Sequence, residues 1–233
     1  LALPFLRSSE ITGLNEQTTN SQNAIAYVHQ QLISEAKQRK TDDQALILMS
    51  HAHMQGSETS ESERPIIIGN EEALSTALFD DVIDYVALGH LHKPQKVGQA
   101  HIRYSGSPLP LSFSEINYKH QIVEVTIDPI QTDESRFTFE PIYIPRPIKL
   151  HKIVGELTDV LAQIQTLAEG EITEIDQREF VDIEYFTLVP PPPNLRQHIE
   201  EIIPKNRYRI VRIFRKRLVT DHQNDAATSV HLE

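Results

Sequence analysis

Two apolar segments, each followed by a pair of histidines, constrain this chain more than any other feature. The segments cover residues 45–49 and 85–88. A continuous apolar run of this length is typical of a strand covered on both faces, as in a parallel sheet with helices on each side. Ligands of such α/β folds bind beyond the carboxyl ends of the strands. The sequence therefore predicts an α/β fold with a site at the histidines that follow: His51, His53, His90 and His92.

The second histidine pair follows a glycine. In extended backbone, residues two apart project to the same face, so we expect His90 and His92 to point into one pocket. Gly89 has no Cβ, so another backbone, a ligand or a metal can come close there. Neutral imidazole is the commonest transition-metal ligand, and nitrogen–oxygen sites suit manganese, zinc or iron. One further histidine from the upstream pair would place three nitrogens around one point.

Composition narrows the classes of function. The chain has 233 residues, a formal net charge of −11 and no cysteine, so thiolate sites and disulfides are excluded. The charge argues against a uniformly basic nucleic-acid binder, but not against a DNA enzyme with local basic groups. The basic stretch 207–217 supplies the DNA-facing candidates Arg207 and Arg209; the alternative is an edge strand protected by charge. No apolar run could span a membrane, and we expect a cytoplasmic protein.

Periodicity along the rest of the chain predicts alternating helices and strands. Residues 1–6 resemble a strand and 8–20 a loop. A helix capped by Asn23 should present an apolar stripe formed by Ile25, Val28, Leu32 and Ala36. Further helices are expected over 71–78, 159–167 and 195–203. Strands are expected over 65–69, 101–105, 121–127, 137–144, 148–154, 180–188 and 208–214, with 121–127 and 137–144 forming an antiparallel hairpin.

Three prolines within 141–147 mark a predicted domain boundary. We expect residues 1–146 to form the part that carries the histidines. Residues 147–217 should form a small α+β capping domain, whose size is marginal but sufficient for independent folding. Residues 218–233 are mostly polar and lack periodicity, which predicts a flexible tail.

The residues around the second histidine pair resemble a known family. The motif GHLH at 89–92 is similar to the closing motif of calcineurin-like metallophosphoesterases. The run ALGHLHKPQ at 87–95, followed by IRYSGSPLPLSFSE at 102–115, resembles one branch, the SbcD nuclease subunits of bacterial SbcC–SbcD complexes. The segment LPFLR at 3–7 and the spacing of His51 and Gly56 fit the same branch. The resemblance covers residues 1–217.

This resemblance implies a fold, a cofactor and site residues. Metallophosphoesterases form a sandwich of mixed sheets with flanking helices and bind two divalent metals, usually manganese. The implied ligands are His51 and His90 for one metal and His92 for the other, whereas His53 matches no ligand position. The family's earlier Asp-x-His, Gly-Asp and Asn-His motifs have no counterpart in this chain. We therefore expect the carboxyl-terminal part of an SbcD-like subunit, with the bridging aspartate and the general-acid histidine upstream of Leu1.

The resemblance also implies an activity and partners. These are manganese-dependent exonuclease and hairpin-opening endonuclease activity on DNA, in replication, recombination and repair, with an SbcC-type ATPase and a homodimer of the intact subunit. Three imidazoles without carboxylates leave a divalent metal under-coordinated, so we expect this chain alone to bind metal weakly and to be inactive. Two alternatives stand beside this hypothesis: a mononuclear zinc hydrolase, and a metal-free DNA- or protein-binding module with structural histidines.

Overall fold

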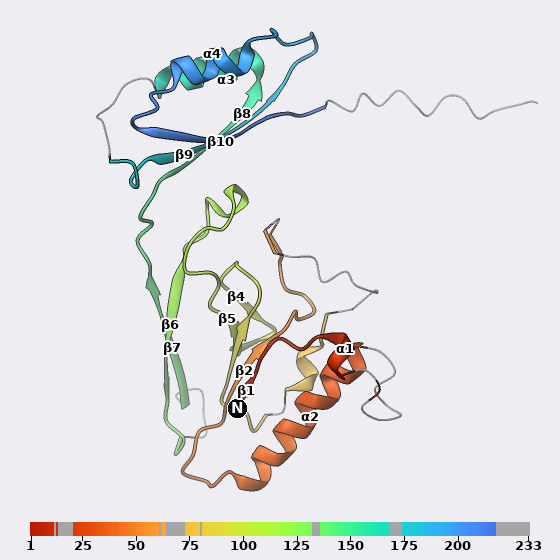
Figure 1. Cartoon of the computed structure of the whole chain (residues 1–233). Coiled ribbons are helices and arrows are strands. Elements are labelled where there is room, and N and C mark those ends of the chain that lie inside the picture. The colour runs from red at the N-terminus through yellow and green to blue at the C-terminus, as the bar shows by residue number, and fades with distance from the viewer. Residues whose placement is uncertain are drawn as a thin grey trace, which may run out of the picture. The chain divides into compact units, whose positions relative to one another are not determined.

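The computed structural model describes residues 1–11, 13, 21–60, 62–63, 73–79, 81–131, 136–167 and 174–217. The chain divides between Arg146 and Pro147 into two compact units, unit 1 with residues 1–146 and unit 2 with residues 147–233 (Figure 1). The predicted strand 65–69 and the predicted tail 218–233 lie outside the described residues.

Unit 1 is built on a five-stranded mixed sheet with the order β1-β2-β3-β5-β4. Four strands are parallel and β4 is antiparallel to β5. The register places His51, the last residue of β2, opposite Gly89, the last residue of β3. Parallel strands with an apolar centre confirm the predicted α/β class. The strands are β1 (Ala2–Leu3), β2 (Ile47–His51), β3 (Tyr85–Gly89), β4 (Gln95–Val97) and β5 (Gln99–Tyr104).

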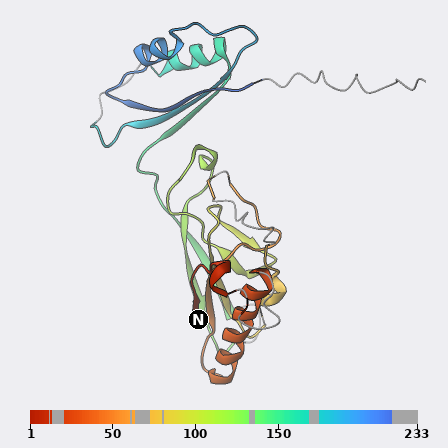
Figure 2. The ribbon, with the colours of Figure 1, turned by 45° about the vertical axis from the view of Figure 1, so that its right-hand side comes forward.

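Helix α2 (Ser21–Arg39) packs along one face of this sheet (Figures 1 and 2). His29 of α2 is buried, with its Nε2 2.8 Å from the Ser50 hydroxyl of β2 and its Nδ1 2.8 Å from the Ile25 carbonyl. A carbonyl only accepts, so Nδ1 carries the proton and Nε2 accepts from Ser50. A polar bridge therefore joins the helix to the centre of the sheet.

The predicted helix is confirmed, but its start and its buried face differ from the prediction. The helix begins at Ser21, so Asn23 lies inside the first turn and is not the cap. The buried positions are Ala24, His29 and Ile33. Ile25, Leu32 and Ala36 of the predicted stripe are only partly buried against the same core. Centring the stripe on the most apolar side chains missed the buried histidine beside them.

The other face of the sheet is covered only in part. The hairpin of β6 (Gln121–Ile127) and β7 (Phe137–Tyr143) confirms the predicted antiparallel pair. The Phe137 ring stacks on Tyr85 at 5.5 Å between centroids, and the Arg103 guanidinium lies 3.8 Å from the Phe139 ring centre. Ile47 and Met49 of β2, however, are 41% and 56% exposed. The expectation that both faces of β2 are covered is therefore wrong for this chain.

Unit 2 alternates strands and helices: β8 (Leu150–Glu156), α3 (Leu157–Thr166), β9 (Glu179–Phe186), α4 (Leu195–Ile202) and β10 (Tyr208–Arg215). All pairings in the sheet order β10-β9-β8 are parallel, so the arrangement is α/β and not the predicted α+β. Val181, Ile183 and Tyr185 are buried on one face of β9. Val160, Ile164 and Ile199 of the helices complete this core.

Several short elements differ from the predictions. A short helix α1 (Ser8–Ile11) opens the predicted loop. Of the predicted helix 71–78, residues 71–72 are outside the described residues, and only a 3₁₀ turn, η1 (Thr76–Leu78), forms. A second 3₁₀ turn, η2 (Phe113–Glu115), and strand β4 were not expected. Within the described part of the chain, no helix has the length and apolar character needed to cross a membrane.

Candidate metal centre

The imidazole of His51 lies over the end of β3. A Cβ built on Gly89 would stand 3.1 Å from His51 Nδ1, which is closer than ordinary packing allows. The space predicted at Gly89 for a backbone, ligand or metal is therefore occupied by the ring of a predicted metal ligand. Glycine at this position lets the ends of two neighbouring parallel strands bring His51 next to the GHLH motif.

His90 has an unusual backbone conformation. Strand β3 ends at Gly89, and His90 follows with φ of 106°. The alternation of an extended chain therefore does not continue to His92, and that part of the sequence argument is wrong. A non-glycine residue with positive φ is strained, and such residues concentrate at functional sites where the surrounding structure holds them. The ring centres of His51 and His53 lie 5.3 Å and 6.3 Å from that of His90.

The environment of these histidines favours neutral imidazoles. Burial lowers the pKa of His51 and of His53. Burial also lowers the pKa of His90, and repulsion from the neighbouring His51 and His53 adds to it, against an opposing effect of the Glu63 carboxylate. A neutral imidazole keeps a nitrogen lone pair for a metal. The group is therefore suited to nitrogen coordination at neutral pH.

His92 is held through its ring and its backbone. Its Nδ1 lies 2.7 Å from Glu115 Oε1 and 2.9 Å from the Ser62 hydroxyl. The His92 amide N–H donates to Glu63 Oε1 at 2.7 Å, and its carbonyl accepts from Ser107 N–H at 3.0 Å. Sequence reasoning missed both carboxylates. Glu115 had a signal, because it closes the SbcD-like run 102–115, whereas Glu63 had none.

Gly106 allows the loop after β5 to pack against His92. Its φ is +87°, and a Cβ would stand 2.7 Å from the His92 carbonyl oxygen and 2.7 Å from Pro94 Cγ. Only glycine fits this combination of backbone conformation and close contact. The SGSP part of the motif therefore packs against the backbone of His92, in the second histidine pair.

The gathered side chains form an incomplete ligand set. Among the residues that the structure describes, no three His, Asp or Glu side chains stand where they could hold a metal ion together. The donors nonetheless fit a metal that takes nitrogen ligands, because the pKa values of His51 and His90 are lowered and His92 has its Nδ1 already engaged. His51, His90 and His92 stay predicted ligands, and His53 lies beside them without a predicted role.

Comparison with known proteins agrees with the motifs. Residues 146–233 match the SbcD_C family, described as "Type 5 capsule protein repressor C-terminal domain". The chain is also 33% identical over 177 residues to a subunit of the nuclease SbcCD from Rhodobacter capsulatus. The chain belongs to the SbcD family. The alignment covers 72% of this chain and 42% of that relative, so the chain spans less than half of the relative's length.

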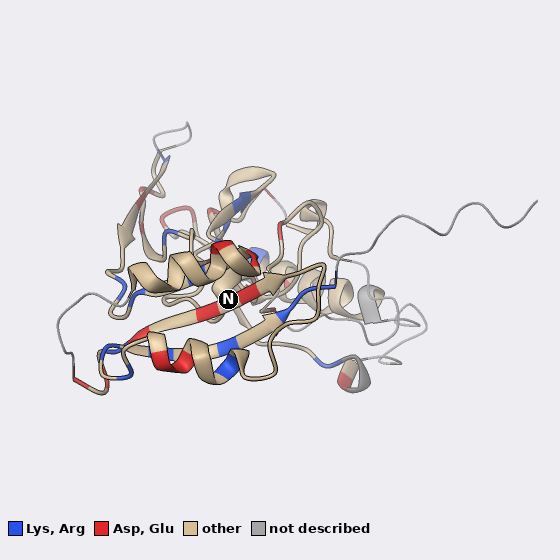
Figure 3. Cartoon of the chain, turned by 90° about the horizontal axis from the view of Figure 1, so that it is seen from above, with Lys and Arg blue, Asp and Glu red and all other residues tan. Residues whose placement is uncertain are grey.

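In this SbcD-family chain, the matched carboxyl-terminal domain begins at Arg146, where unit 1 ends. The candidate DNA residues of unit 2 have partners in their own domain. Arg207 Nη2 lies 3.8 Å from Glu179 Oε1, and the Arg209 guanidinium lies 5.9 Å from the Phe180 ring centre. Acidic residues of β9 lie alongside basic residues of the neighbouring strand β10 (Figure 3), and Asp182 pairs with Arg212 directly opposite it. Much of the basic charge of 207–217 is therefore balanced locally, and DNA contact by Arg207 and Arg209 stays a prediction.

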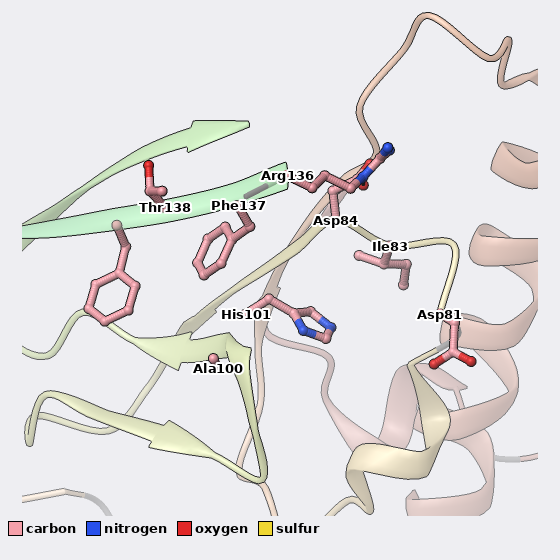
Figure 4. Close-up of a pocket in the computed structure, with 9 residues that line it drawn as sticks. Asp81, Ile83, Asp84, Ala100, His101, Arg136, Phe137 and Thr138 are labelled. Carbon is pink, nitrogen blue, oxygen red and sulfur yellow. Dashed lines mark hydrogen bonds and ion pairs between the residues drawn. The ribbon is translucent and has the colours of Figure 1, made fainter. Parts of the chain in front are cut away.

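A cavity of about 770 Å³ in unit 1, lined in part by His101, lies away from the candidate metal centre, at the opposite end of the parallel strands (Figure 4). Its wall includes the ion pair of Asp84 with Arg136, and Asp84 Oδ2 also accepts from Leu46 N–H at 2.7 Å. Arg136 donates further to the carbonyl of Pro129 at 2.6 Å. Burial alone would raise the pKa of Asp84, but the hydrogen bonds from Arg136 and Leu46 outweigh it and lower that pKa. The pair fastens the hairpin to the sheet.

Proposed function

We propose that this SbcD-family chain is part of the nuclease subunit of an SbcCD-type complex, which hydrolyses DNA phosphodiester bonds with divalent metal ions. The name of the Rhodobacter capsulatus relative, which describes it as a subunit of the nuclease SbcCD, supports the nuclease assignment. The structural observation that carries the proposal is the strained His90, held beside His51 at the carboxyl ends of two parallel strands. Strain of this kind is retained where a side chain must take one position.

The proposed ligand roles follow from the side chains. His51 and His90 would supply neutral nitrogens to one ion, and His92 would supply its Nε2 to the second. Manganese would fit these nitrogens together with oxygen donors from another part of the subunit. When bound, two such ions lower the pKa of a water molecule and stabilise the charge on the phosphate. The chain's own contribution is to keep His51 and His90 neutral and to orient three imidazoles at the carboxyl ends of the strands.

The carboxylates of this centre are already engaged. Glu115 accepts from Leu111 N–H and contacts His92, while Glu63 accepts from the His92 and Ser60 amides. Neither is free to balance the charge of a divalent ion. We propose that this chain alone binds metal weakly and cleaves no DNA. The bridging carboxylates would belong to another part of the subunit, which would also complete the metallophosphoesterase sandwich.

We further propose that the intact subunit acts as an exonuclease and a hairpin endonuclease, as a homodimer together with an SbcC-type ATPase. The naming of the relative as a subunit of SbcCD supports the ATPase partner. The sheet edge at β1, a strand of only two residues, is where further strands of a sandwich could pair. These statements concern the whole subunit, of which this chain spans a part.

The test compares DNA cleavage by an intact subunit, as long as the Rhodobacter capsulatus relative, with DNA cleavage by the 233-residue chain. With manganese present, we expect the intact subunit to degrade linear DNA, His90→Ala to abolish the activity and His101→Ala, at the opposite sheet end, to retain it. Full activity of the His90→Ala subunit would refute the ligand role. DNA cleavage by the 233-residue chain would refute the proposal that its metal site is incomplete. Stoichiometric zinc in that chain would favour a mononuclear zinc hydrolase.

A further inference from the structure

Glu115 is a carboxylate that unit 1 buries completely. It lies at the end of η2, and its side chain has no exposed area. Removing a carboxylate from water is unfavourable unless charged or polar donors replace the water. Four donors surround it: the Ser60 and Ser62 hydroxyls, the Leu111 amide and the His92 ring. The chain therefore retains a costly group at this point and directs it at a candidate metal ligand.

The two carboxylate oxygens of Glu115 have separate tasks. Oε2 accepts from Leu111 N–H at 2.9 Å, which fixes the plane of the carboxylate. Oε1 faces His92 Nδ1 at 2.7 Å and also accepts from Ser62. Both oxygens thus face N–H or O–H donors, with the Leu111 amide on Oε2 and the Ser60 and Ser62 hydroxyls on Oε1. A carboxylate oxygen surrounded by donors acts as an acceptor toward His92 Nδ1.

An acceptor at Nδ1 decides where the imidazole proton lies. The proton of this contact must be on His92 Nδ1, so the lone pair of the neutral ring is on Nε2. Which ring nitrogen binds a ligand is set by the hydrogen bond that the other nitrogen makes. The Glu63 and Ser107 contacts to the His92 backbone prevent the residue from turning as a whole. Ring and backbone are thus fixed independently of each other.

We propose that Glu115 is the positioning residue of the candidate metal centre, which sets the tautomer and the orientation of His92 so that Nε2 is presented to a divalent cation. This inference rests on the proposed function, because it takes His92 as a metal ligand. It goes beyond it by assigning a role to a residue 23 positions along the chain from His92. Glu115 itself contacts no ligand in this assignment and acts through the imidazole.

The direct test is nitrogen NMR of the 233-residue chain labelled with ¹⁵N-histidine, at an alkaline pH where imidazoles are neutral. We expect His92 to carry its proton on Nδ1. In Glu115→Gln, one of the two carboxylate oxygens becomes an NH₂ group, which cannot accept a hydrogen bond. Either Leu111 N–H or His92 Nδ1 then faces that NH₂ group, and we expect the Nε2-protonated form of His92 to appear. Ser112→Ala is the matched control, because Ser112 accepts from Ser114 N–H in the same turn without contacting His92.

Two results would overturn the proposal. One is an Nε2-protonated His92 in the unaltered chain, which decides the question even if Glu115→Gln fails to fold. The other is a folded Glu115→Gln chain in which the tautomer is unchanged. In the intact subunit we expect Glu115→Gln to weaken Mn²⁺ binding about 10–100-fold, as for other carboxylates that orient metal-binding histidines. A different outcome would separate the two claims. If the tautomer of His92 depends on Glu115 but His92→Ala leaves the Mn²⁺ affinity unchanged, Glu115 orients the ring and the proposed metal role of His92 is refuted.

Discussion

Replacing Gly106 by alanine should destabilise unit 1 more than the same change at other glycines with positive φ. A left-handed backbone costs alanine about 1–2 kcal/mol. The new Cβ would also meet the His92 carbonyl oxygen and Pro94 Cγ at 2.7 Å. Relieving that contact means overpacking, at about 1–3 kcal/mol, and loss of the Ser107–His92 hydrogen bond, at about 1 kcal/mol. We expect a total of about 3–6 kcal/mol.

Gly56 provides the matched control. Its φ is +77°, but a Cβ built there meets nothing within 4 Å. Gly56→Ala therefore carries only the backbone cost, partly offset by the lower entropy of the unfolded chain, and we expect about 1 kcal/mol. The difference between the two variants isolates the contact with the His92 loop.

The assay is urea unfolding of both variants and the unaltered chain, followed through amide NMR signals of unit 1 so that unit 2 does not contribute. The free energy of unfolding is obtained by linear extrapolation. Equal destabilisation by Gly106→Ala and Gly56→Ala would refute the reasoning, because it would mean that the loop can move away from His92 without cost.

Two further predictions concern charge. The pKa values of His29, His51, His53 and His90 are lowered in the folded chain, so the unfolded chain binds protons first as the pH falls through the ordinary imidazole value of 6.5. Unit 1 should therefore lose stability below that pH. Glu115, whose pKa is also lowered, adds to this loss only near the ordinary carboxyl value of 4.5. Urea midpoints that stay constant from neutral pH down to about 5.5 would contradict the prediction. In unit 2, Asp182 is 1% exposed and accepts two hydrogen bonds of 2.8 Å from Arg212, so Asp182→Ala should cost about 2–4 kcal/mol. Arg196→Ala, which breaks an exposed pair with Glu200, should cost at most about 0.5 kcal/mol by the same unfolding measurement, and similar losses in the two variants would refute the contrast.

Local periodicity was sufficient for most elements. Helix α2 and the helices and strands of unit 2 follow from spacing that can be counted along the chain, because a helix or strand repeats its pattern every few residues. The motifs of 87–95 and 102–115 placed the candidate centre and the family. The same reasoning failed where coverage of a surface depended on distant segments. Ile47 and Met49 belong to a strand whose apolar composition is typical of burial on both faces. The segments that cover a strand come from elsewhere in the chain, so the sequence of the strand does not predict its coverage.

The sequence by itself determined that histidines follow two apolar strands and that the chain resembles SbcD. Only the tertiary structure decided that His90 leaves the strand with positive φ, that Gly89 makes room for the His51 ring, and that Glu115 reaches Nδ1 of His92. The last two are contacts between residues far apart in the chain, 23 positions for Glu115 and His92. Their geometry depends on the paths of the connecting loops, which residue spacing does not encode. The histidine motif thus indicates a centre, and the fold selects the ring nitrogen available to it.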